Sequence, residues 1–232
     1  MGAACFPASG YKGHPVIDGK SQEDLYASWN PAELFMRQGR ERVAIRLLKG
    51  LDVFPVPGLP CLEIGYGRLG WLATLLGWGL RTEDLYGIEL EAERARVAGA
   101  AFPGATLEIG SAVELPWGSE IFQLVVASTV FTSILDPDER KSVAREMIRV
   151  LRPSGAVLFY DFRVNSPANP KVRKVSRGEL HHLFPGMHGV IRSVTLAPPV
   201  TRGVVSWSWA LATVLESVPF LRTHLLAILV KQ

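Results

Sequence analysis

The chain has 232 residues, 48% of them hydrophobic and 20% charged, with a formal net charge of +3 at pH 7, which fits one packed globular domain. Its basic residues are scattered, so the composition does not indicate a nucleic-acid partner. Its two cysteines, Cys5 and Cys61, are too few for a disulfide framework. Together with an N-terminus that has no signal-peptide pattern, they favour a cytoplasmic location.

The first part of the chain is expected to be an appendage on the main domain. Residues 1–19 hold several Gly and Pro and little periodicity, so we expect a flexible arm. Residues 20–52 are expected to form N-terminal helices that act as a lid or cover. The longer helix starts with Asn30 as the N-cap and Pro31 at its first position, and it runs to about Lys49.

Residues 53–232 are expected to form one domain in which strands and helices alternate. The expected strands are 61–64, 84–89, 106–109, 121–128, 156–162, 190–196 and 225–230. Helices are expected at 69–80, 92–101, 137–151, 177–184 and 207–218. Apolar, β-branched strands that alternate with helices predict an α/β fold with a parallel sheet covered on both faces. The apolar stretch 204–230 contains charged residues and a proline, so we expect a buried helix and strand there and no membrane span.

A glycine-rich turn follows the first expected strand, in the pattern Glu63-x-Gly65-x-Gly67-x-x-Gly70. Glycines allow a tight turn and a close approach of the backbone to a ligand, and the next helix directs its amides at the turn. The carboxylate of Glu63 suits a cationic ammonium group and would repel a pyrophosphate. The turn therefore favours a ligand with an amino-acid end over a dinucleotide.

Further polar residues are expected at the same edge of the sheet. Glu89 ends the second strand at a spacing typical of an acid that binds ribose hydroxyls; interaction with a helix dipole is the alternative. The segment Gly110-Ser111-Ala112 follows the third strand, where the base of a nucleoside would rest. Ser128 ends the fourth strand at this same carboxyl edge, where ligands bind in open α/β sheets.

With these motifs the chain resembles the small-molecule branch of the class I S-adenosylmethionine-dependent methyltransferases, over about residues 26–231. The match also includes Leu-Pro-Trp at 115–117 and Val-Leu-Arg-Pro-Ser-Gly at 150–155. Within that branch it resembles a bacterial subgroup of polysaccharide and natural-product pathways, through the segments 130–136, 160–167 and 221–224. The resemblance implies a Rossmann-like, seven-stranded, mostly parallel sheet with an antiparallel last strand, and S-adenosylmethionine as the cofactor.

The resemblance also assigns cofactor-binding residues. They are Glu63, Gly65, Tyr66, Gly67, Gly70, Glu89, Leu90, Ser111, Ala112, Ser128 and Val130. Two of these depart from the family pattern. Family members usually carry an Asp that bonds the adenine amino group where this chain has Ser111, and a small residue where it has Tyr66. We expect the bulk of Tyr66 to shape or partly cover the methionine pocket.

Methyl transfer is an in-line displacement in which the protein supplies alignment and a dry pocket. Asp161 is the candidate that orients or deprotonates an acceptor, and Arg163 the candidate that holds an anionic one; a structural ion pair is the alternative for both. The other candidates for the acceptor pocket are Tyr26, Trp29, Phe131, Thr132 and Tyr160, with ordinary packing as the alternative for those at 26, 29, 131 and 132. No histidine–carboxylate cluster has metal-ligand spacing, so we expect no metal.

These features predict an enzyme that methylates a small molecule, at oxygen, on a sugar-containing or natural-product scaffold; the substrate part rests on the resemblance. One alternative is a non-catalytic module that binds S-adenosylmethionine. Another is a nicotinamide-dependent oxidoreductase, against which Glu63 and the lack of a substrate domain argue. The N-terminal helix and the region around Trp207 and Trp209 could supply a homodimer surface.

Overall fold

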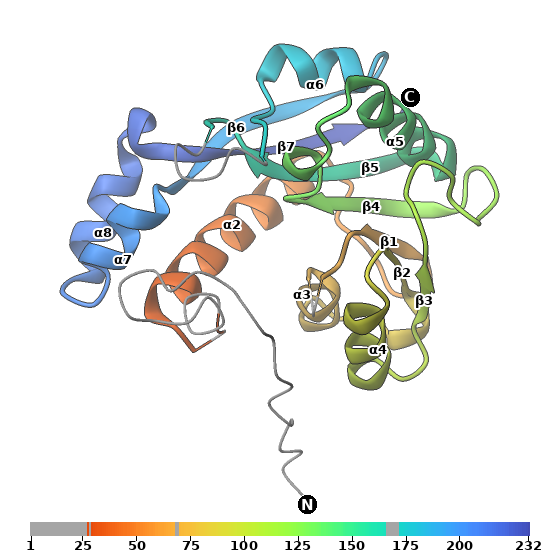
Figure 1. Cartoon of the computed structure of the whole chain (residues 1–232), viewed down its shortest axis with the longest axis horizontal. Helices are drawn as coiled ribbons and strands as arrows, with labels where there is room; N and C mark the ends of the chain where they lie inside the picture. The colour runs from red at the N-terminus through yellow and green to blue at the C-terminus, as the bar shows by residue number, and fades with distance from the viewer. Residues whose placement is uncertain (1–26, 28, 68–69, 166–171) are drawn as a thin grey trace, which may run out of the picture.

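The computed structural model describes residues 27, 29–67, 70–165 and 172–232. Its centre is a seven-stranded sheet with the strand order β3-β2-β1-β4-β5-β7-β6 (Figure 1). The strands are β1 (Cys61–Ile64), β2 (Leu85–Glu89), β3 (Thr106–Ile109), β4 (Phe122–Ser128), β5 (Leu151–Phe162), β6 (His188–Leu196) and β7 (Arg222–Val230). The first five strands pair in parallel, and β7 runs antiparallel to both β5 and β6. The expected fold class is therefore confirmed.

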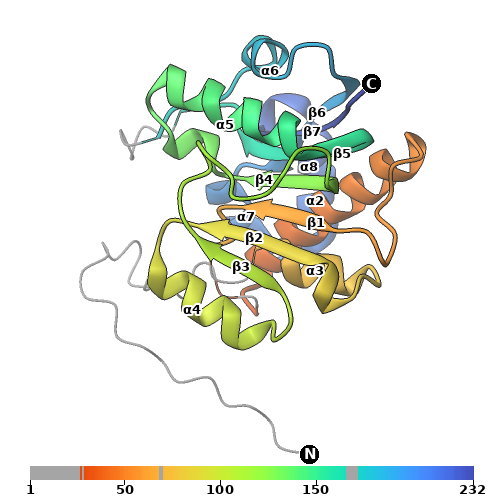
Figure 2. The same ribbon diagram turned by 90° about the vertical axis from the view of Figure 1, so that its right-hand side faces the viewer.

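Helices cover both faces of the sheet (Figures 1 and 2). They are α2 (Pro31–Gly50), α3 (Leu72–Gly77), α4 (Ala92–Ala101), α5 (Pro137–Val150), α6 (Arg177–Leu183), α7 (Pro198–Val204) and α8 (Trp209–Ser217). Because side chains alternate along a strand, Leu62 and Ile64 pack in the cluster that includes α5 and α6. Cys61 faces the opposite way, into the cluster with α2, α3 and α4.

Two helices begin where their caps predict. The Asn30 side chain accepts a hydrogen bond from Ala32 N at 3.0 Å, and Pro31 opens α2. Asp136 does the same for α5, accepting from Asp138 N at 2.8 Å. An N-cap acceptor satisfies an amide that has no partner inside the helix.

Other elements differ from the sequence prediction. The prediction placed no element between residues 196 and 207, but α7 forms at Pro198–Val204 because prolines are tolerated in the first turn of a helix. Helix α8 starts at Trp209, two residues later than expected, since Ser208 caps it by accepting from Leu211 N at 3.2 Å. Helix α3 is shorter than expected and ends at Gly77. Strand β5 starts at Leu151 and is longer than expected.

The expected arm at 1–19, Tyr26 and most of the short helix expected from Ser21 to Trp29 lie outside the described residues. Within the expected N-terminal cover, α2 packs beside α7 and α8 (Figure 1). Phe35 of α2 meets the ring of Trp209 edge-on, with centroids 5.4 Å apart. The domain boundaries remain a prediction. None of the described helices has the length and apolarity needed to cross a bilayer.

Candidate active site

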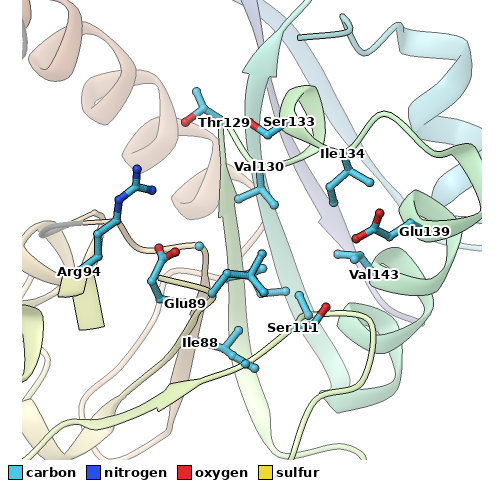
Figure 3. Close-up of a pocket in the computed structure, with 15 residues that line it drawn as sticks. Ile88, Glu89, Arg94, Ser111, Thr129, Val130, Ser133, Ile134, Glu139 and Val143 are labelled. Atoms are coloured by element: carbon cyan, nitrogen blue, oxygen red, sulfur yellow. The ribbon is translucent and has the colours of Figure 1, made fainter. Parts of the chain in front are cut away.

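A cavity of about 260 Å³ opens at the carboxyl ends of β1, β2 and β4 (Figure 3). This volume is just below the usual range of about 300–1,000 Å³ for small-molecule sites. Of the residues proposed from sequence, six line it: Gly65, Glu89, Leu90, Ser111, Ala112 and Val130. The other described residues that line it are Ile64, Ile88, Arg94, Gly110, Thr129, Ser133, Ile134, Glu139 and Val143.

Glu89 joins the cavity to the glycine turn. Its Oε2 accepts a hydrogen bond from Gly67 N at 2.9 Å, and its Oε1 accepts from Glu91 N at 3.1 Å. The residue is 6% exposed and lines the cavity from the end of β2. One carboxylate thus holds the turn against β2 and faces the cavity.

The glycines of the turn have conformations and surroundings that favour glycine. The φ values are +62° at Gly65, +59° at Gly67 and +41° at Gly70. Residues with a Cβ atom are strained in this region of backbone conformation. A Cβ at Gly65 would lie 2.8 Å from Cγ2 of Val130. The close approach of β1 and the segment after β4 therefore depends on this glycine.

Glu63 lies behind the turn, on the α3 side of the sheet. Its carboxylate accepts hydrogen bonds from Trp71 N at 2.8 and 2.7 Å and from Leu72 N at 2.9 Å. It is 1% exposed, and a Cβ at Gly70 would lie 2.4 Å from its Oε1. Burial raises the pKa of Glu63 to about 8, while the two amides oppose that shift. Glu63 thus fastens the start of α3 to β1, and it is not among the described residues that line the cavity.

The described residues that line the cavity also do not include four other expected cofactor residues: Tyr66, Gly67, Gly70 and Ser128. The ring of Tyr66 is 1% exposed and packs over Gly87 of β2, where a Cβ would lie 2.5 Å from its Cδ1. The glycine at position 87 therefore makes room for the large residue in the turn. Beside Ser128, Thr129 faces the cavity with a φ of +56°. Sequence reasoning missed Thr129, because a positive φ at a threonine has no sequence signal.

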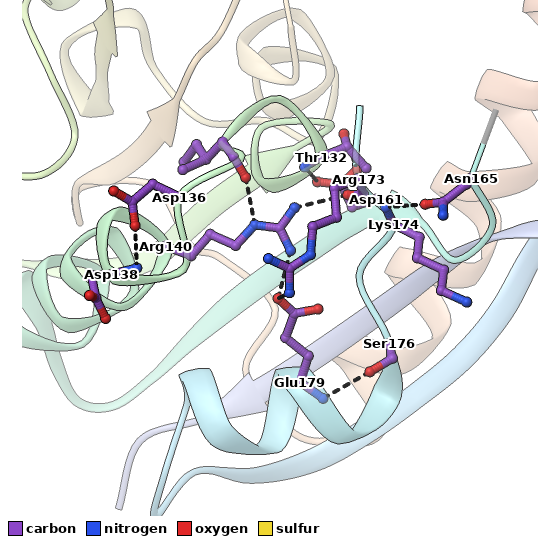
Figure 4. Close-up of polar contacts among 11 residues, drawn as sticks. Thr132, Asp136, Asp138, Arg140, Asp161, Asn165, Arg173, Lys174, Ser176 and Glu179 are labelled. Atoms are coloured by element: carbon purple, nitrogen blue, oxygen red, sulfur yellow. Dashed lines mark hydrogen bonds and ion pairs between the residues drawn. The ribbon is translucent and has the colours of Figure 1, made fainter. Parts of the chain in front are cut away.

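Asp161 lies at the end of β5, and both oxygens of its carboxylate accept hydrogen bonds (Figure 4). Its Oδ1 accepts from Thr132 Oγ1 at 2.6 Å and from Phe162 N at 2.8 Å, and its Oδ2 accepts from Thr132 N at 3.1 Å. Burial raises its pKa to about 6, against the effect of these hydrogen bonds. Among the described residues, neither Asp161 nor Arg163 forms the ion pair given as its alternative. Arg163 Nη1 instead donates to the carbonyl oxygens of Pro219 at 3.3 Å and Arg222 at 2.9 Å.

A buried arginine ties the neighbouring segments together (Figure 4). The side chain of Arg140, 1% exposed, donates to Ile134 O at 2.7 Å, to Glu179 Oε1 at 2.6 Å and to Arg173 O at 2.9 Å. Arg173 N in turn donates to Thr132 O at 2.9 Å. Helix η2 (Phe131–Ser133) is therefore held from α5, from β5 and from the segment before α6.

The aromatic candidates are mostly part of the core. Phe131 is fully buried, with its ring centroid 5.1 Å from that of Phe159. The Tyr160 hydroxyl is 2.9 Å from Thr195 Oγ1, and its ring stacks on His224 with centroids 4.8 Å apart. Trp29 is 71% exposed. Phe131 therefore packs in the core, and its role at the acceptor pocket stays a prediction.

The N-terminal cover adds a cation that sequence reasoning missed. The guanidinium of Arg40 in α2 lies 5.3 Å from the ring centroids of both Trp71 and Tyr160, a cation–π arrangement. It thereby contacts one ring beside the glycine turn and another in β5. Among the described residues, no group of three or more His, Cys, Asp or Glu side chains could hold a metal ion.

Residues 62–159 match the family model described as a methyltransferase domain. The methyltransferase GfsG of Streptomyces halstedii is 27% identical over 147 residues, which are 62% of this chain. These comparisons support a class I S-adenosylmethionine-dependent methyltransferase. The region it shares with GfsG spans about half, 51%, of that relative.

Solved structures of methyltransferases have the same fold as this chain. A S-adenosylmethionine-dependent methyltransferase of Thermotoga maritima has a TM-score of 0.61 and 19% identity, with 89% of this chain and 95% of that chain covered. A TehB-like methyltransferase of Corynebacterium glutamicum has a TM-score of 0.57 and 17% identity, with 84% and 88% covered. The comparisons support S-adenosylmethionine as the cofactor.

Proposed function

We propose that this methyltransferase holds S-adenosylmethionine in the cavity beside the glycine turn and methylates an oxygen atom of a small molecule on a sugar-containing or natural-product scaffold. The observation that carries the cofactor placement is the position of Glu89. Its carboxylate bonds the amide of Gly67 and also lines the cavity. A carboxylate at that point accepts hydrogen bonds from a ribose diol next to the turn that takes the methionine end.

The residues present fit this cofactor. Gly65 leaves no room for a side chain beside Val130, so the backbone of the turn stays open to a ligand. Leu90 and Ala112 add apolar surface where a purine would lie. Glu63 keeps its expected role toward the ammonium group as a proposal, which the position of its carboxyl group at the start of α3 supports. Four more residues remain predicted to contact the cofactor with their backbone atoms. They are Tyr66, Gly67 and Gly70 of the turn and Ser128 at the end of β4.

Bound S-adenosylmethionine supplies an activated methyl group on a sulfonium. The chain's own residues align the acceptor and exclude water from it. Three hydrogen bonds from the protein hold the carboxylate of Asp161, and two of them come from Thr132. We therefore propose that Asp161 acts on the acceptor indirectly, by fixing the position of Thr132. Asp161 would then be a positioning residue that sets η2, and no group is assigned as the base that takes the acceptor's proton.

The acceptor class rests on the subgroup segments named in the sequence, and their convergence supports it. Thr132 of the first segment bonds Asp161 of the second. Tyr160 of the second stacks on His224 of the third. Three segments far apart in the chain thus meet at the end of β5, with the two contacts on opposite faces of the sheet. The candidates for contacts with the acceptor remain Phe131, Tyr160, Arg163 and, from the N-terminal cover, Trp29 and Tyr26.

The remaining predictions about partners have less support. The exposed side chains of Trp207 and Trp209 are compatible with a homodimer surface at α8. The buried free thiol of Cys61 is compatible with a reducing, cytoplasmic location. A lack of nucleic-acid partners is proposed from the scattered charges alone.

A two-stage experiment tests the function. Calorimetry with S-adenosylhomocysteine should give saturable binding, and NAD should give none. The chain is then incubated with S-adenosylmethionine and pairs of glycosides that carry either a hydroxyl or an amine at the same position, and methylated products are identified by mass spectrometry. Turnover of the hydroxyl members supports the proposal. Turnover of the amines only would overturn O-methylation, and binding without any turnover would favour a non-catalytic module.

A further inference from the structure

The two ends of the cofactor cavity differ in their chemistry. Figure 3 shows Glu89 and Arg94 at one end and Glu139 and Val143, from α5, at the other. Between them lie apolar side chains: Ile88, Ala112, Val130 and Ile134. With a ribose at Glu89, a flat base would extend along these apolar walls toward α5. Glu139 and Ser111 are the polar side chains among the described lining residues at that end.

The carboxylate of Glu139 is available to a ligand. Glu139 is the third residue of α5, a position where glutamate often bonds back to the N-cap amide. Within the described chain, no hydrogen bond or ion pair engages its side chain. The neighbouring cations have other partners: Lys141 pairs with Asp138 at 2.8 Å, and Arg140 pairs with Glu179 at 2.6 Å. The side chain of Glu139 instead lines the cavity.

The residue type decides what this end of the cavity can select. An ionised carboxylate only accepts hydrogen bonds, whereas a serine hydroxyl both donates and accepts. Ser111 therefore cannot distinguish an amino group from a carbonyl group on a purine. Glu139 can, because it attracts an N–H donor and repels the lone pairs of a carbonyl oxygen.

We propose that Glu139 accepts a hydrogen bond from the exocyclic amino group of the adenine. It thereby supplies from α5 the acid that is absent at Ser111. This inference rests on the proposed placement of the cofactor. It makes Glu139 a specificity residue that distinguishes adenosyl from inosyl ligands.

The test compares two ligands that differ at this group and in the proton that the neighbouring N1 carries in the inosyl ring. S-adenosylhomocysteine carries the amino group, and S-inosylhomocysteine carries a carbonyl in its place. Calorimetric titration of the full chain should give an adenosyl preference of at least about tenfold, the order expected for one hydrogen bond to a charged group. Glu139→Gln should reduce this preference to about threefold or less, since an amide can donate as well as accept.

Asp138→Asn is the matched control, because Asp138 lies on the same helix and pairs with Lys141 away from the cavity. It should keep the full preference. Melting temperatures of all three proteins show whether they are folded. If Glu139→Gln binds S-adenosylhomocysteine with an unchanged preference, the proposal is wrong while the cofactor site stands. If the unaltered chain binds neither ligand, the proposed function fails and this inference falls with it.

Discussion

The contact between Gly70 and Glu63 makes a substitution that adds one methyl group unusually informative. In Gly70→Ala, the new Cβ would lie 2.4–2.6 Å from the carboxylate of Glu63, so the carboxylate must move. The buried amides of Trp71 and Leu72 would then lose their acceptor, at a cost of about 1–3 kcal/mol each. The positive φ of +41° adds about 1–2 kcal/mol for any residue with a Cβ.

A second glycine isolates the contact from the backbone strain. Gly186 has a φ of +76°, and nothing described lies within 4 Å of its would-be Cβ, so Gly186→Ala carries the strain alone. We expect Gly70→Ala to be less stable than Gly186→Ala by about 2–6 kcal/mol. For a chain of this size that corresponds to a melting temperature lower by about 5–20 °C. Thermal unfolding without cofactor measures the difference. Equal melting temperatures would refute the idea that Glu63 is fixed against Gly70.

Three further predictions follow from individual carboxylates. Glu89→Ala should weaken S-adenosylhomocysteine binding by about 1–3 kcal/mol in calorimetry; unchanged affinity would reject the ribose role. Thr132→Val removes the 2.6 Å hydrogen bond to Asp161 and should cost about 1.5–3 kcal/mol in urea unfolding, whereas Thr132→Ser should cost clearly less; similar losses would argue against this bond. The pKa of Glu63 is raised from 4.5 to about 8, so its contribution to stability is complete below about pH 4.5 and is lost as the pH rises toward 8. Unfolding free energies should therefore fall less between about pH 5 and about pH 8 in Glu63→Gln; an identical fall in both proteins would contradict that pKa.

Local sequence determined most of the fold. The caps at Asn30 and Asp136 place the starts of α2 and α5, because a side-chain acceptor next to a proline acts within one turn of the chain. The strands Cys61–Ile64 and Thr106–Ile109 are found where their apolar patterns predict them. The exceptions are α7, which was not predicted, and the ends of α3, α8 and β5.

The sequence also indicated which chemistry gathers at the carboxyl edge of the sheet, because parallel strands bring their ends together whatever their loops do. It could not say which way each side chain turns. Glu63 bonds the amides of Trp71 and Leu72, and Tyr66 packs over Gly87. Asp161 accepts hydrogen bonds from Thr132 and Phe162. Glu139 lines the cavity from α5. The sequence predicts that this helix follows β4 in the chain, but it does not predict that the helix borders the cavity. Only the packing of distant elements against one another decides these orientations, since burial and hydrogen-bond partners far apart in the chain set the energy of each rotamer.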